Sequence, residues 1–254
     1  MLAPSALAPC KRVSPVISLL ALEPRAGSTT IAFNLAVQVA VAGVQGDRRP
    51  RPVCLLRDGE QTAAIGLDPQ ALASYFRSHP VSADEEVVEL AVRHPTGCEL
   101  FCIGDGGLSG QQLRLLLPVL RRFYDLIVID CPTDDHWLRE VAVDASDATL
   151  LVGLPSSDSA SAASAWADRA WERGIVGKMA VVTNRVQAGQ RLPDGLGSGL
   201  QNQISIPEDR LVASHDRQGL PWVIRFESSA RVAADELSRQ LVPQLMGQRV
   251  GHAA

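Results

Sequence analysis

The sequence lacks three features that would each point to a large class of proteins. Its five cysteines form no C-x-x-C pair and have no histidine at metal-ligand spacing, which argues against a cysteine metal site and is typical of buried thiols in a reducing cytoplasm. Every apolar run is broken by proline, glycine or charge before ~18 residues, so no transmembrane segment is expected. The first twelve residues lack a basic leader followed by a long apolar run, so no secretory signal is expected either.

Clustered positive charge is also scarce. The net charge is −4 and the pI is near 5.7, which argues against a broad nucleic-acid-binding face, because binding to phosphates requires grouped lysine and arginine. Two short basic groups, 48–51 and Arg121-Arg122, are interpreted as solvated charges at a turn and a helix end.

The length and the apolar content predict one folded domain. A chain of 254 residues with 46% apolar residues can bury a full core, and α/β sheets of this size are often a single domain. We expect a flexible N-terminal arm over 1–12, one domain over 13–246 and a short tail over 247–254.

Short apolar runs alternate with segments of helical period along most of the chain. This alternation predicts an α/β fold, with a mainly parallel β-sheet covered by helices on both faces. In such sheets ligands bind beyond the carboxyl ends of the strands. The strands are expected at 16–22, 53–56, 99–103, 126–129, 148–153, 179–183 and 204–206, and the helices at 29–42, 84–92, 111–123, 159–171 and 229–245.

Three shorter segments also have recognisable local patterns. A short helix is expected within 69–80, and 82–85 has the form of a capping box for the helix that follows. The aperiodic, glycine-containing stretch 187–203 is expected to be a surface loop.

The most informative segment is the junction between the first strand and the first helix. There Gly27-Ser28-Thr29-Thr30 opens a helix, so backbone N–H groups and the positive helix end face one point, where a phosphate could bind. A phosphate loop reads G-x-x-x-x-G-K-[ST], but here Ser28 replaces the lysine, while Pro24 and Arg25 replace earlier glycines. The alternative is a strand-to-helix turn in which Ser28 or Thr29 is only an N-cap.

Several further fragments resemble the MinD and ParA group of deviant phosphate-loop ATPases, and they occur in that family's order. The first-helix segment Asn34-Leu35-Ala36 is similar to the family's N-L-A, and Tyr124–Pro132 resembles its strand that ends in an aspartate, here Asp130. The resemblance covers roughly residues 13–245, and the similar fragments are 23–30, 34–36, 53–61, 124–132, 181–185, 206–210 and 219–221.

The resemblance implies a single-domain P-loop NTPase fold and a nucleotide site. It implies that the phosphates contact Gly27, Ser28, Thr29 and Thr30, that magnesium contacts Thr29 and Asp130, and that the base contacts Asn184, Arg185 and Pro207. Each match has a structural alternative: Asp130 and Asn184 are also turn formers, and proline is also common at a helix start. ATP and Mg²⁺ are the implied cofactors, and their absence stays open.

Departures from the family pattern change the expected function. Glu23 and Ser28 stand where the family has its two loop lysines, and Arg57 stands in place of the first aspartate after the second strand, with Asp58 displaced by one position. Phosphoryl transfer depends on positioning and charge neutralisation, so efficient hydrolysis is not expected. Arg25 is a candidate to supply the missing positive charge, and the alternative is an exposed loop arginine.

The loop Ala26–Thr30 resembles that of the CpaE and TadZ subgroup, which is associated with pilus assembly and polar positioning and has G-G-x-G-[AS]-[ST]-T. The receiver-like domain common there does not fit in this length. The resemblance implies a scaffold that acts as a homodimer with protein partners at a pole or at the inner membrane face. One alternative is a slow Mg-ATP-dependent dimerising ATPase switch. Another is a membrane-surface protein that uses an apolar stripe at the C-terminal end. Asp235 and Glu236 lie beside this stripe and Pro243 interrupts its last turn, which disfavours the membrane-surface alternative.

Overall fold

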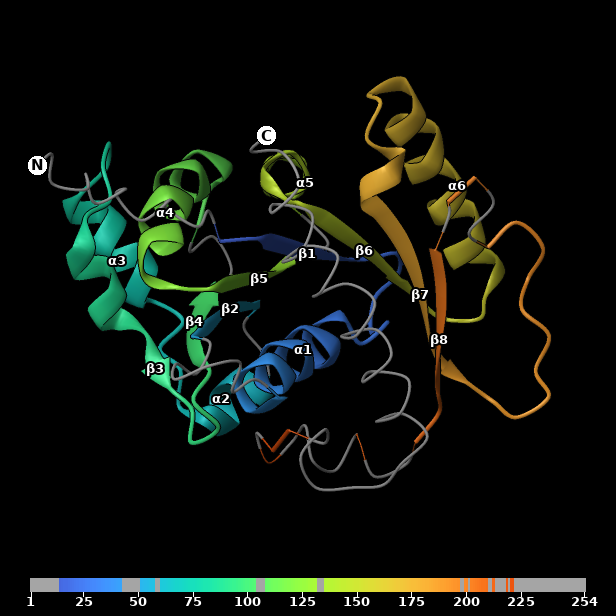
Figure 1. The fold of residues 1–254 in the computed structure, drawn as a ribbon, viewed down its shortest axis with the longest axis horizontal. Helices are drawn as coiled ribbons and strands as arrows, with labels where there is room; N and C mark the ends of the chain where they lie inside the picture. Colours follow the sequence, from blue (N-terminus) through green and yellow to red (C-terminus); the bar gives the residue numbers. More distant parts are fainter. Residues whose placement is uncertain are drawn as a thin grey trace, which may run out of the picture.

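The computed structural model describes residues 14–42, 51–57, 60–103, 108–131, 135–196, 199–200, 202–209, 212, 218 and 220–221. The predicted N-terminal arm, the C-terminal tail and the helix predicted over 229–245 lie outside these residues. Within them the chain forms one mainly parallel sheet with helices on both faces, as the sequence predicts (Figure 1).

The sheet contains eight described strands in the order β3-β4-β2-β5-β1-β6-β7-β8. Neighbouring strands are parallel, except that β3 pairs antiparallel with β4 at one edge. The carboxyl ends of β1, β2 and β5 therefore lie together near the middle of the sheet, where the family resemblance places a site. The strands are β1 (Val16–Ala21), β2 (Pro52–Arg57), β3 (Val92–Arg93), β4 (Glu99–Ile103), β5 (Leu126–Cys131), β6 (Ala148–Gly153), β7 (Met179–Val186) and β8 (Asn202–Pro207).

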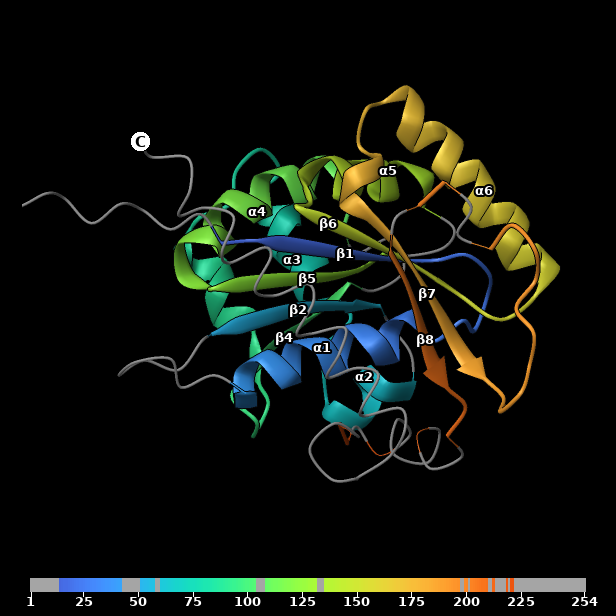
Figure 2. The ribbon, with the colours of Figure 1, turned by 45° about the vertical axis from the view of Figure 1, so that its right-hand side comes forward.

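The central strands are apolar on both faces because each face packs against helices. One core lies under the helices α3 (Ala71–Ser78), α4 (Gly110–Phe123), α5 (His136–Ala145) and α6 (Ser157–Glu172). The other lies under α1 (Ser28–Ala42), with α2 (Glu60–Ile65) on the same side of the sheet (Figure 2). Burying both faces is what a parallel sheet requires, and it accounts for strands that read as continuous apolar runs.

Three α-helices begin at residues whose side chains cap them. Ser109 forms a capping box with Gln112 at the start of α4, Asp135 caps α5 by accepting from the Leu138 N–H, and Ser156 caps α6. Each of these side chains satisfies a backbone N–H that would otherwise lack an acceptor. The predicted helices at 29–42, 111–123 and 159–171, and the short helix within 69–80, are confirmed.

Two local predictions are wrong between α3 and β3. Residues 85–90 form a 3₁₀ helix, η1 (Glu85–Leu90), where an α-helix over 84–92 was expected. Its N-cap is Asp84, which accepts from the Glu86 N–H at 3.1 Å, and not Ser82. Four further elements were not predicted from the sequence. These are the helices α2 and α5, the two-residue strand β3, and the 3₁₀ turn η2 (Val176–Lys178) before β7.

The four cysteines among the described residues are buried thiols, as the sequence predicts. Cys54, Cys98, Cys102 and Cys131 are free and buried. Burial raises the pKa of the Cys54, Cys98 and Cys131 thiols, so these groups stay protonated and unreactive at neutral pH. Among the described residues, no helix combines the length and apolarity needed to cross a bilayer.

Candidate functional site

The loop that joins β1 to α1 has a conformation that the sequence enforces. Gly27 has φ +89° and lies directly before the first residue of α1, and its carbonyl accepts from the Ile31 N–H at 3.0 Å. Arg25 also has positive φ, at +62°, and the Ala26 N–H donates to the Glu23 carbonyl at 3.3 Å. A non-glycine residue with positive φ is uncommon, and such residues concentrate at functional loops.

Asp130 brings the loop and β5 together. It lies near the carboxyl end of β5 and is completely buried. The Ser28 hydroxyl donates to its Oδ1 at 2.8 Å, and the Thr29 hydroxyl donates to its Oδ2 at 2.5 Å. The predicted loop residues and the predicted strand aspartate therefore converge on one point at the start of α1.

Arg57, the last residue of β2, supplies the positive charge at this point. Its Nε lies 3.2 Å from Asp130 Oδ2, and its Nη2 lies 3.3 Å from Ser28 Oγ and 3.2 Å from Thr29 Oγ1. Its backbone N–H also faces Asp130 Oδ2, at 3.4 Å. The Arg57 side chain is 27% exposed, so this guanidinium lies between a buried carboxylate and the solvent.

The magnesium ion that the resemblance implies does not fit the arrangement. Mg²⁺ requires oxygen ligands at about 2.0–2.1 Å in octahedral geometry. Both Asp130 oxygens already accept hydrogen bonds from the protein, and the Thr29 hydroxyl donates to one of them. The Arg57 guanidinium occupies the space beside both groups and would repel a divalent cation. The metal role of Thr29 and Asp130 stays a prediction.

Asn184 holds the loop from the side of β7. Its Nδ2 donates to the Ala26 carbonyl at 2.8 Å, and its Oδ1 accepts from the Arg185 N–H at 3.0 Å. A Cβ on Gly27 would lie 2.4 Å from Asn184 Nδ2, so only glycine fits against this amide. In this structure the side chain fixes the loop, and its predicted contact with a base stays a prediction.

Glu23, which stands where the family resemblance places a lysine, points back into its own domain. Its Oε1 accepts from the Ser156 hydroxyl at 2.6 Å, from the Ser159 hydroxyl, and from the Leu154 N–H at 3.3 Å. Burial alone would raise the pKa of Glu23, but these hydrogen bonds outweigh burial, so the pKa lies below its ordinary value. The carboxylate therefore lies at the start of α6, where the helix dipole favours negative charge.

The other predicted ligand residues are less closely joined to the loop. Thr30 lies in the first turn of α1, and its carbonyl accepts from Asn34 Nδ2 at 2.8 Å. Arg185 is exposed, with φ +59°, in the irregular stretch where β7 pairs with β8. Pro207 ends β8 opposite Val186. Arg25 is exposed and makes no hydrogen bond or ion pair with another described residue.

Sequence reasoning missed two contacts at this site. Arg57 was recognised as a substitution but not as the partner of Asp130, and Ser156 and Ser159 were not connected with Glu23. The strand order brings Arg57 to Asp130, because it makes β2 and β5 neighbours whose carboxyl ends meet, and this order is seen only in the structure. The parts of the resemblance that involve Asp58, Pro132 and Gly219 lie outside the described residues.

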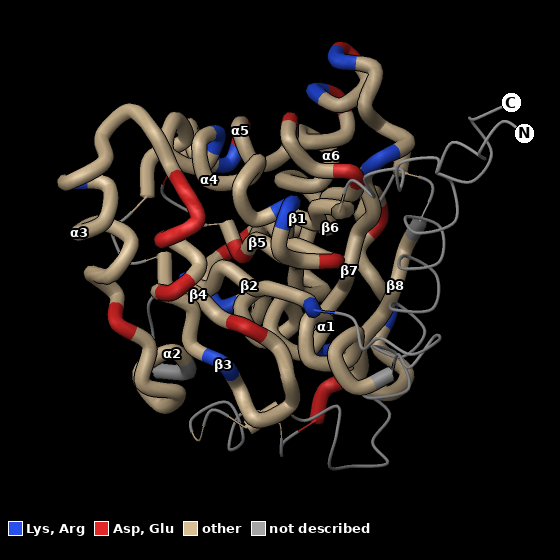
Figure 3. Tube along the Cα trace, turned by 60° about the vertical axis from the view of Figure 1, so that its left-hand side comes forward, with Lys and Arg blue, Asp and Glu red and all other residues tan. Residues whose placement is uncertain are grey.

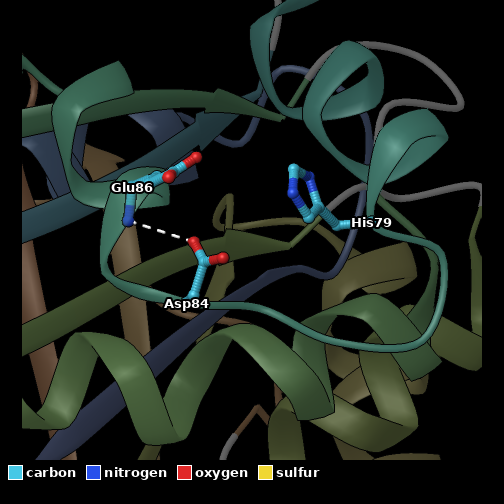
Figure 4. A group of neighbouring side chains, drawn as sticks. All are labelled: His79, Asp84 and Glu86. Atoms are coloured by element: carbon cyan, nitrogen blue, oxygen red, sulfur yellow. Dashed lines mark hydrogen bonds between the residues drawn. The ribbon is translucent and has the colours of Figure 1, made fainter.

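A second group of candidate metal ligands lies between α3 and η1. One ligand atom from each of His79, Asp84 and Glu86 lies within 4.8 Å of the others, in an acidic segment beside α3 (Figures 3 and 4). Two of these side chains already hold the local structure. Asp84 Oδ1 accepts from the Tyr75 hydroxyl at 2.8 Å and from the Glu86 N–H, and the His79 ring stacks on Tyr75 at 4.4 Å. This group is therefore explained as the cap of η1.

Comparison with known proteins identifies the fold. No protein-family model matches the chain, and no curated protein matches it in sequence. Among solved structures it is similar to a ParA family ATPase from Chlorobium tepidum, with a TM-score of 0.71 and 14% identity over 89% of this chain and 98% of that one.

Two cell-division proteins give the same TM-score of 0.71. The septum site-determining protein MinD from Pyrococcus horikoshii, solved with Mg-ADP, is 19% identical over 92% of this chain and 98% of that one. The MinC:MinD cell division protein complex from Aquifex aeolicus matches with 18% identity over 90% of this chain and 96% of that one. The strand order, the loop after β1 and these similarities together show that the chain has the ParA/MinD P-loop NTPase fold.

Proposed function

We propose that this chain is a catalytically degraded P-loop protein of the MinD/ParA type, which acts as a localisation or assembly scaffold and binds ATP weakly or not at all. The observation that carries the proposal is the ion pair between Arg57 and Asp130. It satisfies internally the carboxylate that the family resemblance assigns to magnesium.

The charges around the loop support the same proposal. The family's two loop lysines are Glu23 and Ser28 here, and both side chains are engaged within the domain. Catalysis of phosphoryl transfer requires positive groups directed at the transferred phosphate. The Ser28 and Thr29 hydroxyls of this loop already donate to Asp130. Such a loop is suited to keeping a fixed shape, and not to repeated ATP hydrolysis.

The partners and the location follow from the resemblance. Ala26–Thr30 resembles the loop of the CpaE and TadZ subgroup, so we infer a homodimer that takes part in pilus assembly or polar positioning. Recruitment to a pole or to the inner membrane face would occur through protein partners. The similarity to a MinC:MinD complex supports the inference that a fold of this type can present a surface to another protein.

The second candidate function is a slow Mg-ATP-dependent dimerising ATPase switch in partitioning or cell-division positioning. It is favoured by the exposed side chain of Arg25 in the loop, which is free to turn towards a bound phosphate. In this alternative Arg25 replaces the lysine.

Isothermal titration with Mg-ATP and Mg-ADP, with a turnover assay on the same sample, separates the two functions. The scaffold predicts weak or undetectable binding and no multiple turnover. Steady ATP hydrolysis that is lost in both Thr29→Ala and Asp130→Ala would favour the switch. Arg191→Ala is the matched control, because this arginine forms only an exposed pair with Asp194. Sedimentation velocity with and without nucleotide tests the homodimer.

A further inference from the structure

The arrangement around Asp130 explains how the loop is stable without a bound ion. A fully buried carboxylate is costly unless an opposite charge and hydrogen bonds compensate it. Here the opposite charge comes from Arg57, and the hydrogen bonds come from Ser28, Thr29 and the Arg57 backbone.

We propose that the Arg57 guanidinium is the resident cation of this loop, and that it excludes divalent metal ions from the Thr29 and Asp130 oxygens. The proposal rests on the proposed function in one respect, namely that the site has lost its metal chemistry. It adds the residue responsible and states that the loss is reversible, because the oxygen ligands themselves are still present.

The geometry supports the guanidinium as a substitute for a metal ion. Arg57 reaches the same carboxylate oxygen as the Thr29 hydroxyl, and its Nη2 also contacts the Ser28 and Thr29 hydroxyls. One planar cation thus contacts all three side chains, with the multiple fixed donors that distinguish arginine from lysine. A metal ion placed there would have to displace these donors and would also meet the positive charge of the guanidinium.

Adjacent strands make this placement a property of the fold. Arg57 ends β2 and Asp130 lies near the end of the neighbouring strand β5, with Leu55 paired to Ile129. Arg57 therefore reaches Asp130 from a fixed backbone position. Removing its side chain is expected to leave the Thr29 and Asp130 oxygens in place, still joined by the Thr29 hydroxyl hydrogen bond but without a cation beside them.

Manganese is a suitable probe, because binding removes the electron paramagnetic resonance signal of free Mn²⁺. The experiment titrates Mn²⁺ into the full chain without nucleotide, for the wild type, Arg57→Ala and Arg57→Ala combined with Asp130→Asn. Arg51→Ala is the matched control, because this arginine precedes the same strand at its other end. Circular dichroism confirms that each variant is folded, and Arg57→Gln is the substitute if Arg57→Ala does not fold.

The expected result is no binding by the wild type or by Arg51→Ala at millimolar Mn²⁺, and binding at least about tenfold tighter in Arg57→Ala. The added Asp130→Asn change is expected to abolish this gain. Mn²⁺ binding by the wild type that Asp130→Asn removes would overturn the proposal, and so would an Arg57 variant that binds no better than the wild type. ATP turnover by the wild type contradicts the scaffold function in a separate assay, so the two failures can be distinguished.

Discussion

Strand β2 has an arginine at each end, and the two arginines differ in how deeply their carboxylate partners are buried. Arg51, just before the strand, is 44% exposed and pairs at 2.9 Å with Glu99, which is 13% exposed. Arg57, at the end of the strand, pairs at 3.2 Å with a carboxylate that is fully buried. Both carboxylates also accept from hydroxyl groups, Glu99 from Tyr124 at 2.6 Å and Asp130 from Ser28 and Thr29. They differ in burial, because Asp130 is fully buried and has Arg57 as its only cation among the described residues.

The difference shows which end of the sheet still carries the features of a ligand site. At the amino end the Arg51–Glu99 pair is accessible to water, and the loss of one partner can be compensated by solvent. At the carboxyl end the same kind of pair closes a position from which water is excluded, so the cation there is required for stability. Two measurements compare the two ends of the sheet, and two more test the loop at the carboxyl end.

The largest expected effect comes from breaking the buried pair. We expect Arg57→Ala to lower the free energy of unfolding by about 3 kcal/mol, because it leaves Asp130 buried without a cation. Arg51→Ala is expected to cost about 1 kcal/mol or less. Urea unfolding measures both, and a double-mutant cycle with Asp130→Ala isolates the coupling between the partners. Equal losses at the two ends of β2 would contradict the contrast.

The second effect concerns two glycines, one at each end of the sheet. Gly27 and Gly97 both have strongly positive φ, but an added Cβ meets Asn184 Nδ2 at 2.4 Å only at Gly27. We expect Gly97→Ala to cost about 1 kcal/mol from backbone strain alone and Gly27→Ala to cost about 1–2 kcal/mol more. Thermal unfolding compares them, and similar losses would show that the Asn184 contact yields easily.

The third effect is a pH dependence centred on Glu23. Its pKa is lower in the folded protein than the ordinary value of 4.5, so its stabilisation is complete above that value and is lost as pH falls through the folded-state pKa. We expect Glu23→Gln to cost about 1–2 kcal/mol at pH 7 and to approach the wild type as the pH is lowered below the folded-state pKa of Glu23. Glu172→Gln, an exposed change at the end of α6, is the control. A loss independent of pH would contradict the assignment.

The smallest effect, and the only stabilising one, is expected at Arg25. This residue is exposed and adopts positive φ, which glycine adopts without strain. We expect Arg25→Gly to raise the free energy of unfolding by about 0.5 kcal/mol, because released strain exceeds the added chain entropy. Arg185→Gly is the parallel change at the end of β7, and a loss of stability at Arg25 would show that its side chain makes a contact of its own.

The sequence predicted the parallel sheet well, because strands such as β1 and β6 are apolar on both faces and fit only a doubly covered sheet. Through the resemblance it singled out Ser28, Thr29 and Asp130, which the structure brings together, but their roles as phosphate and magnesium ligands stay predictions. The 3₁₀ helix η1 was missed because Val87, Val88 and Leu90 also fit an α-helical period. Neither Glu23 nor Arg57 revealed its partner. The partner of Arg57 depends on strand order, and the partners of Glu23 depend on how the loop meets the start of α6; composition and periodicity specify neither.

The hydrogen bonds that shape the loop also constrain the order of folding. Ser28 and Asp130 are 102 positions apart, and Asn184 and Ala26 are 158 apart. Contacts that close such long chain segments form late, because the entropy lost on closing them is recovered only after the intervening strands have paired. During synthesis the loop therefore acquires its native shape only after β7 has emerged and joined the sheet. A partner that recognises the finished loop would distinguish chains that include β7 from shorter ones.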